Sequence, residues 1–258
     1  MHKGDTVLIT GASSGIGEAF ARELTSQGLH AVLVARSESK LRSLAGELSH
    51  AYNVNVEAIP QDLTEPGAAL KIKKRLVEKG IQIDHLINNA GFGLRGAFLD
   101  SRAIDDESQI AVNVSAVVSF CRTFAPDFVS RGRGSIVNVS SLAGFPPTPY
   151  FAVYGASKAF VLHFSIALAE ELRSKGVRVL TLCPGATETG FFKVSGEVPG
   201  AERRRSAQDV VATALRALKK SGPLAIDGSS NRVKARLVSL FSKPLAARLM
   251  SRFSKPKQ

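Results

Sequence analysis

The chain has 258 residues, 44% of them hydrophobic, and its 34 Lys and Arg against 22 Asp and Glu give a formal net charge of +12. This length and apolar content predict one globular domain with a full core. The sequence shows no apolar run of about 18 residues and no signal peptide, which favours a cytoplasmic protein. Two cysteines in apolar surroundings, Cys121 and Cys183, and five histidines without ligand spacing argue against a disulfide and against a bound metal.

The positive charge is concentrated at the C-terminal end of the chain. Residues 232–258 contain eight Lys or Arg and no acidic residue, so eight of the twelve net charges belong to this segment. The rest of the chain is only mildly basic. This distribution does not indicate a nucleic-acid-binding domain, and we expect no nucleic-acid partner.

Strand-like apolar runs alternate with helical patterns along the chain. The expected strands lie at about 6–10, 31–34, 54–59, 85–88, 135–139, 177–182 and 224–226, and the main expected helices at about 15–28, 38–50, 105–130, 152–174 and 206–220. Thr64 is expected to cap the helix after the third strand. The alternation predicts an α/β fold, a single Rossmann-type doubly wound domain with about seven parallel strands and helices on both faces.

A glycine-rich turn, TGASSGIG at residues 10–17, follows the first expected strand and opens the first helix. Glycines at 11, 15 and 17 permit positive φ and a close approach of the backbone to a ligand. The first-turn N–H groups and the helix dipole face an anion there, and Ser13 and Ser14 add hydroxyl donors. The turn predicts a phosphate site, with an ordinary strand-to-helix turn as the alternative.

Tyr154 and Lys158 stand four residues apart in a helical segment, so their side chains share one face. Moving a phenol pKa from about 10 to about 7 requires roughly 4 kcal/mol of preference for the charged form. An adjacent ammonium and an oxidised nicotinamide both supply part of it. The pair is a candidate acid/base couple or simply two surface residues, and Ser140 and Ser141, at the end of a strand, are candidate active-site hydroxyls or caps.

Taken in order, the glycine-rich turn, the NNAG motif at 88–91, Ser141, Tyr154 and Lys158 resemble the short-chain dehydrogenase/reductase family over about residues 5–228. The resemblance implies hydride transfer between a nicotinamide and a carbonyl or secondary alcohol. It assigns Tyr154 as the proton donor, Ser141 as the hydrogen-bond donor to the substrate oxygen, Lys158 as the group that lowers the tyrosine pKa and holds the ribose, and Asn113 as the holder of a relay water. Ser141 is chosen over Ser140 because it precedes Tyr154 by 13 residues, the family's usual separation.

The resemblance also implies a set of cofactor-binding residues. They are Gly11, Ser13, Ser14, Gly15, Ile16 and Gly17 in the turn, Asp62 and Leu63 on the adenine side, Asn89, Ala90 and Gly91 beside the ribose, Tyr154 and Lys158, and Pro184, Gly185, Thr187 and Thr189 around the nicotinamide amide.

The cofactor's identity depends on the end of the second strand. An acidic residue there would meet the ribose hydroxyls of NAD, whereas an Arg would meet the 2′-phosphate of NADP. The chain has Arg36 and no acid before Glu38. Arg36 therefore predicts NADP, assisted by Lys40 and Ser13, with a solvated Arg as the alternative.

The substrate is expected beneath residues 190–206, the segment that covers it in the family. Five phenylalanines form either an apolar pocket or part of the core: Phe92, Phe145, Phe151, Phe191 and Phe192. A pocket would suit a hydrophobic ketone or a 3-oxoacyl-type substrate. The rival hypothesis is a non-catalytic NADP-binding sensor or scaffold of the same fold, and either protein is expected to be a homodimer or homotetramer.

The expected domain organisation is a catalytic domain at 1–228 and a basic amphipathic tail at 229–258. Apolar residues recur at helical spacing in this tail, which predicts two short helices: Val233, Leu237, Leu240, Phe241, Leu245, Leu249 and Phe253. We expect the stripe to pack on the body or on a second subunit. The alternative is weak contact with an anionic membrane surface, which would make the protein peripheral to a membrane.

Overall fold

The computed structural model describes residues 1–196 and 204–254. Its centre is one parallel sheet of seven strands in the order β3-β2-β1-β4-β5-β6-β7. The strands are β1 (Thr6–Thr10), β2 (His30–Ala35), β3 (Val56–Pro60), β4 (His85–Asn88), β5 (Gly134–Val139), β6 (Val177–Cys183) and β7 (Leu224–Ile226). Their largely apolar runs are buried by helices on both sides, as a parallel sheet requires. The fold class and the strand number are as predicted.

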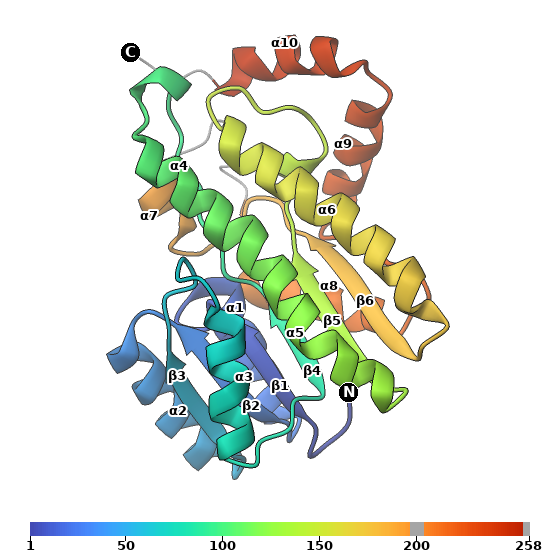
Figure 1. Cartoon of the computed structure of the whole chain (residues 1–258). Helices are drawn as coiled ribbons and strands as arrows, with labels where there is room; N and C mark the ends of the chain where they lie inside the picture. The colour runs from blue at the N-terminus through green and yellow to red at the C-terminus, as the bar shows by residue number, and fades with distance from the viewer. Residues whose placement is uncertain (197–203, 255–258) are drawn as a thin grey trace.

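Helices cover both faces of the sheet (Figure 1). α1 (Gly15–Ser26), α2 (Glu38–Tyr52) and α8 (Ala207–Leu218) share one apolar cluster with the sheet, and α3 (Ala68–Glu78), α5 (Ala116–Ser130) and α6 (Ala152–Arg173) share the other. The strand order reverses between β1 and β4, which pair with each other. In such sheets a crevice lies at the carboxyl ends of these strands.

The segment predicted as one helix over 105–130 consists of three parts. α4 (Ala103–Ile110) and α5 are joined by a π-helical turn, η2 (Ala111–Ser115), which contains Asn113. Hydrophobic periodicity does not report such a local widening of the helix. π-Turns of this kind often occur at functional sites.

The prediction that Thr64 caps a helix is wrong, because α3 begins at Ala68 with Gly67 at the N-cap position. The backbone N–H and the hydroxyl of Thr64 instead donate to Asp62 Oδ1, at 2.9 Å each. This local side-chain turn competes with helix formation and delays the helix. Asp62 is thereby held at the carboxyl end of β3.

By length and composition, α6 is the one described helix that could cross a membrane. In this fold it packs on β6 and β5, and it carries Tyr154 and Lys158 on its buried face. Both cysteines, Cys121 and Cys183, are buried and unpaired. Within the described ranges, no three His, Cys, Asp or Glu side chains are grouped as metal ligands.

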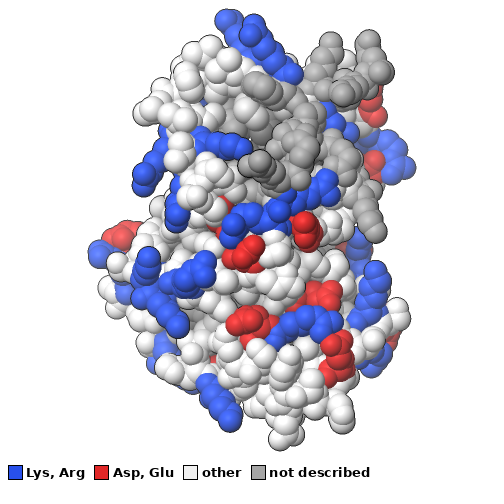
Figure 2. Space-filling view, turned by 180° about the vertical axis from the view of Figure 1, so that it is seen from behind, with Lys and Arg blue, Asp and Glu red and all other residues white. Residues whose placement is uncertain are grey.

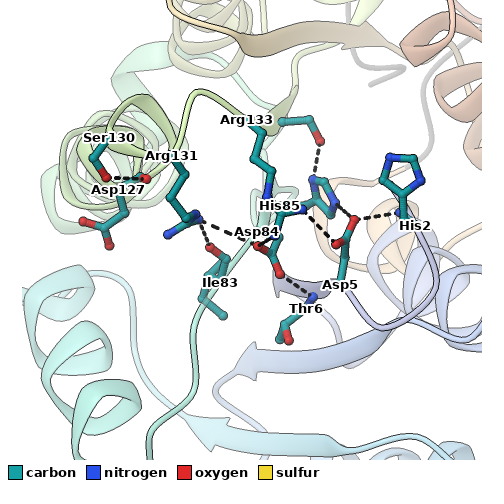
Figure 3. A network of polar contacts seen from close by, with 11 residues as sticks. His2, Asp5, Thr6, Ile83, Asp84, His85, Asp127, Ser130, Arg131 and Arg133 are labelled. Carbon is teal, nitrogen blue, oxygen red and sulfur yellow. Dashed lines mark hydrogen bonds and ion pairs between the residues drawn. The ribbon is translucent and has the colours of Figure 1, made fainter.

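A polar network ties together the amino ends of β1, β4 and β5 (Figure 3). His85 Nε2 lies 2.9 Å from Asp5 Oδ2, and its Nδ1 lies 2.9 Å from Ser135 Oγ. The Arg133 guanidinium contacts Oδ1 of both Asp5 and Asp84, at 3.3 and 3.2 Å. Because a carboxylate only accepts hydrogen bonds, His85 Nε2 carries the proton and Nδ1 accepts from the serine.

The contacts from Ser135 to His85 and from His85 to Asp5 resemble those of a hydrolytic Ser–His–Asp triad. The groups around them, however, are those of a structural network. The Ser135 N–H donates to the Asp84 carbonyl at 3.4 Å, so it is not free to stabilise an oxyanion. The network also lies at the edge of the sheet opposite the carboxyl ends of the strands. We therefore assign it to stability.

Asp5 makes the stability of this fold depend on pH. Burial raises its pKa, but hydrogen bonds from His85 and from the backbone of His2 outweigh burial and hold the pKa at about 2, below the ordinary 3.8. Between these pH values the unfolded chain binds a proton that the folded chain does not, so stability is lost as pH falls through this window. The difference corresponds to roughly 2 kcal/mol.

We expect Asp5→Asn to remove much of this pH dependence and to lower stability at neutral pH. Urea midpoints measured across the window test the prediction, with Asn at the exposed Asp100 as the control. Parallel pH profiles for wild type and Asp5→Asn would contradict it.

Candidate functional site

The glycine-rich turn joins β1 to α1 and leaves the helix N-terminus open. Gly11 and Gly15 have φ of +65° and +59°, and a Cβ on Gly17 would lie 2.3 Å from the Gly11 carbonyl oxygen. Ser14 is the N-cap residue of α1 without a side-chain capping bond, and within 1–196 and 204–254 the Ser13 hydroxyl has no hydrogen-bond partner. Backbone N–H groups, hydroxyls and the helix dipole therefore face the crevice together.

The NNAG motif fixes this turn from the neighbouring strand. Asn89 Nδ2 donates to the carbonyls of Thr10 and Gly11, at 3.0 and 3.2 Å, while Thr10 Oγ1 accepts from the N–H groups of Asn89 and Ala90, at 3.0 and 3.1 Å. The Asn89 amide thus positions the phosphate turn. Sequence reasoning missed the role of Thr10, whose only signal is a hydroxyl at the end of a buried strand.

Arg36 follows β2 directly and its side chain is exposed. It lies beside Asp62, whose pKa is lowered by the hydrogen bonds from Thr64, against the effect of burial, and by the charge of Arg36. Leu63, next in the chain, is buried. Among the described residues the guanidinium of Arg36 forms no ion pair. Its donors and those of Lys40, exposed in the first turn of α2, are thus available at the rim of the crevice.

The four predicted catalytic residues converge at the carboxyl ends of β4 and β5. Lys158 Nζ donates to the Val139 carbonyl at 2.9 Å and lies 5.8 Å from the centre of the Tyr154 ring. A Cβ on Gly91 would lie 3.0 Å from Asn113 Oδ1 and 3.1 Å from Lys158 Nζ. Gly91 is thus the position at which the NNAG motif meets the catalytic group.

Asn113 is fully buried, and its amide fixes the neighbouring elements. Its Nδ2 donates to the Phe92 carbonyl at 2.8 Å and to Ser157 Oγ at 3.0 Å, and its Oδ1 accepts from the Phe92 N–H at 3.1 Å. These bonds join the π-turn, the loop after β4 and α6. Asn113 therefore acts here as a positioning residue.

The two serines after β5 have different surroundings. Ser140 is buried and its hydroxyl donates to the Lys158 carbonyl at 2.6 Å. Ser141 Oγ accepts from the Ala143 N–H at 3.1 Å, and the Ser141 hydroxyl also interacts with the Tyr154 phenol. Of the two serines, Ser141 is the one that interacts with the Tyr154 phenol.

Burial controls the titration of the central pair. It raises the pKa of Tyr154 to about 12, although the interaction with Ser141 opposes this shift, and it lowers the pKa of Lys158 to about 8. The Lys158 Nζ is directed to the Val139 carbonyl and lies over the face of the Tyr154 ring. At neutral pH the phenol is therefore protonated.

The loop after β6 closes the opposite side of the crevice. The Pro184 carbonyl accepts from the Leu142 N–H at 2.9 Å, beside Ser141, and Thr187 Oγ1 donates to the Gly185 carbonyl at 3.1 Å. The Thr189 methyl lies 2.9 Å from the position that a Cβ on Gly15 would occupy. The loop therefore contacts both the segment that contains Ser141 and the glycine-rich turn.

Aromatic rings flank the Tyr154 phenol. The ring centres of Phe151 and Phe191 lie 4.5 and 5.3 Å from that of Tyr154. Phe192 instead packs under the Arg204 guanidinium, 4.1 Å from its ring centre. Of the predicted lid at 190–206, residues 197–203 lie outside the described part.

Arg205, in the described C-terminal part of the predicted lid, is held by an ion pair that the sequence analysis did not predict. Asp227, fully buried after β7, accepts from Arg205 Nε at 2.6 Å and from the Thr213 hydroxyl at 2.7 Å. The only sequence feature that could have indicated this contact is the single acidic residue after the last strand. These contacts fix the return of the chain into α8.

Comparisons with known proteins agree with this geometry. Residues 5–198 match the family model described as short chain dehydrogenase. The very-long-chain 3-oxoacyl-CoA reductase of Bos taurus is 36% identical over 195 residues, which cover 74% of this chain and 62% of that protein. The chain thus spans less than two thirds of the length of this relative.

Two solved structures share the whole fold. A short-chain dehydrogenase from Sphingobium yanoikuyae in complex with NADPH has a TM-score of 0.83 and 36% identity, with 98% of each chain covered. A short chain dehydrogenase/reductase from Burkholderia phymatum in complex with NAD has a TM-score of 0.84 and 25% identity, with 99% of this chain and 98% of that chain covered. Its own motifs, fold and relatives show that this chain belongs to the short-chain dehydrogenase/reductase family.

Proposed function

We propose that this protein is an NADP-dependent oxidoreductase that reduces an apolar ketone or a 3-oxoacyl compound, or oxidises the corresponding secondary alcohol. The observation that carries the proposal is the buried Tyr154 phenol, which interacts with Ser141 and has Lys158 Nζ 5.8 Å from its ring centre. A protonated phenol at the mouth of a nucleotide crevice is suited to protonating a carbonyl oxygen.

The chain's residues fit a nicotinamide dinucleotide. A Cβ on Gly11, Gly15 or Gly17 would lie 2.8 Å from Ala90, 2.9 Å from Thr189 or 2.3 Å from the Gly11 carbonyl oxygen, so only glycines allow the close packing of this turn, as in turns that bind a pyrophosphate. Lys158, with one N–H held by Val139, has donors left for ribose hydroxyls. A bound nicotinamide supplies the hydride.

The protein's part is to hold the substrate oxygen and provide its proton. The Ser141 hydroxyl, which lies beside the phenol, donates a hydrogen bond to the carbonyl oxygen, and the Tyr154 hydroxyl donates the proton. Asn113 and Gly91 keep the Lys158 ammonium beside the phenol. In the oxidation of an alcohol, the phenolate form of Tyr154 accepts the proton of the substrate hydroxyl.

The preference for NADP rests on Arg36. Its exposed guanidinium lies at the end of β2, where a 2′-phosphate would be bound, and Lys40 and Ser13 are further candidate donors to that phosphate. We expect Arg36→Asp to weaken NADPH binding far more than NADH binding, because an acid repels the phosphate but accepts hydrogen bonds from ribose hydroxyls. Fluorescence titration of both cofactors measures the ratio.

The matched control is Arg42→Asp on the exposed side of α2. It makes the same charge change, and we expect it to leave the ratio of the two affinities unchanged. Equal losses for NADPH and NADH in Arg36→Asp would show that Arg36 does not contact the phosphate.

The apolar substrate class is supported by Phe151 and Phe191 beside the phenol and by the 3-oxoacyl-CoA reductase among the relatives. A screen of long-chain ketones, 3-oxoacyl thioesters and secondary alcohols, followed by NADPH absorbance, tests the activity. Tight NADPH binding without turnover of any of them would favour the non-catalytic sensor or scaffold.

We also propose that the protein is cytoplasmic and forms a homodimer or homotetramer. The exposed Ile104 and Ile110 of α4 and Phe160 of α6 support the assembly, because α4 and α6 contact each other and carry apolar surface that a second copy would cover.

A further inference from the structure

The C-terminal helices expose most of their large apolar side chains. α9 (Ser229–Ser239) and α10 (Lys243–Ser254) follow β7 and lie across the end of the molecule above α6 (Figure 1). Exposed fractions are 82% for Leu240 and 44–55% for the other members of this set: Val233, Leu237, Phe241 and Leu245. The side chain of Phe253 lies outside the described residues. The stripe was expected to pack on the body or on a second subunit, and in the single chain these five residues are left exposed by the body.

The tail is nevertheless attached to the body by other groups. Ala235 and Ala246 are almost fully buried, so the small residues face the protein. Lys243 Nζ donates to the Phe145 carbonyl at 3.2 Å, and Arg95 Nη2 donates to the Ser254 carbonyl at 2.7 Å. The tail is therefore docked with its large apolar side chains turned outward.

Cations surround these apolar side chains. Arg232, Lys234, Arg236, Lys243, Arg248 and Arg252 are all exposed. None of them forms an ion pair within the described residues, and the segment has no acid. Figure 2 shows Lys and Arg side chains at the top of the molecule, where Figure 1 places α10.

A second apolar element lies near the end of α10. The short 3-10 turn η1 (Phe98–Asp100) exposes 65% of Phe98 and 93% of Leu99. The bond from Arg95 to Ser254 joins the loop before this turn to α10. We call α9, α10 and η1 together the basic apolar face.

We propose that the basic apolar face docks on an anionic lipid bilayer. Amphipathic basic helices with exposed Leu and Phe lie in the membrane interface, where apolar side chains enter the acyl boundary and cations meet acidic headgroups. A second copy is a poor occupant, because a two-fold interface would bring the same unpaired cations against each other. A bilayer matches both the charge and the apolar side chains.

The docked orientation would bring the substrate entrance to the membrane. Phe145 lies in the segment after Ser141, and Arg95 lies in the loop after Gly93, whose Cβ would be 2.6 Å from the Tyr154 ring. The two loops that contact the tail therefore flank the catalytic phenol. Apolar substrates dissolved in the bilayer would reach the site from that side, although docking itself does not depend on the proposed reaction.

Vesicle co-sedimentation of the full chain tests the proposal. We expect binding to phosphatidylcholine vesicles that contain phosphatidylserine, little binding to phosphatidylcholine alone, and loss of binding as salt is raised. Lys234→Glu combined with Arg236→Glu should lower the partition coefficient by at least about thirtyfold. Leu240→Asp combined with Phe241→Asp should also release the protein.

Two control pairs make the same changes elsewhere. Leu70→Asp with Val77→Asp alters exposed apolar residues of α3, and Lys219→Glu with Lys220→Glu reverses exposed cations at the end of α8. Both should bind as wild type. No binding to acidic vesicles, equal binding to neutral ones, or wild-type binding by both tail variants would overturn the proposal.

Sedimentation velocity without lipid tests whether a second copy of the chain, and not a bilayer, covers the basic apolar face. A Leu240→Asp, Phe241→Asp variant that lost self-association and kept its vesicle binding would show that a second copy covers the face, and the proposal would be wrong. NADPH-dependent turnover of a water-soluble ketone is measured without vesicles, so failure of the proposed reaction and failure of docking are distinguishable.

Discussion

Replacing Tyr154 by Phe is expected to lower the rate of ketone reduction by about 10²–10⁴-fold while cofactor binding stays close to wild type. The substitution keeps the ring that packs on Phe151 and Phe191 and removes only the hydroxyl. With a pKa raised to about 12, the phenol is protonated at neutral pH. Its loss leaves Ser141 to polarise the carbonyl without protonating it.

Steady-state rates and NADPH titration measure the two halves of this prediction. Tyr52→Phe, on the exposed face of α2, removes the same hydroxyl far from the site and should have wild-type activity. If Tyr154→Phe retained near-wild-type turnover, the proton would have to come from another group. If Tyr154→Phe lost both turnover and NADPH affinity, the main role of the phenol would be to bind the cofactor.

The strands of the fold and the pairing of two site residues could be predicted from the sequence, but other parts of the site could not. Strand positions follow from short apolar runs that a parallel sheet buries on both faces, and Tyr154 and Lys158 share a helix face because of their spacing. The surroundings of Asn113 were not predictable. A π-turn changes the backbone by one residue and leaves the hydrophobic pattern unchanged.

Long-range polar contacts could not be predicted from the sequence either. The bonds of His85 to Asp5 and Ser135, and of Arg205 to Asp227, join residues that only the sheet order brings together. In the tail, the helical period correctly separated apolar from basic positions. It could not tell which apolar positions face the body, because the small Ala235 and Ala246 are the buried ones.

The glycine at position 17 should be the most sensitive one in the cofactor turn. A Cβ there would lie 2.3 Å from the Gly11 carbonyl oxygen and 2.5 Å from Asn89 Nδ2. Both atoms belong to the hydrogen-bonded unit that joins β1, α1 and the loop after β4, so neither moves without breaking the turn. We expect Gly17→Ala to destabilise the protein by about 1–3 kcal/mol and to reduce NADPH affinity sharply.

Gly46→Ala is a matched control, since Gly46 also lies within a helix, α2, and a Cβ there meets nothing within 4 Å. Helix propensity favours alanine at both positions by about 0.5–1 kcal/mol, so Gly46→Ala should stabilise the chain slightly and bind NADPH as wild type does. Only steric contact separates the two variants. Equal urea midpoints and equal NADPH affinities for Gly17→Ala and Gly46→Ala would show that α1 can move away from β1 at little cost, and that the close approach at Gly17 is not what shapes the phosphate turn.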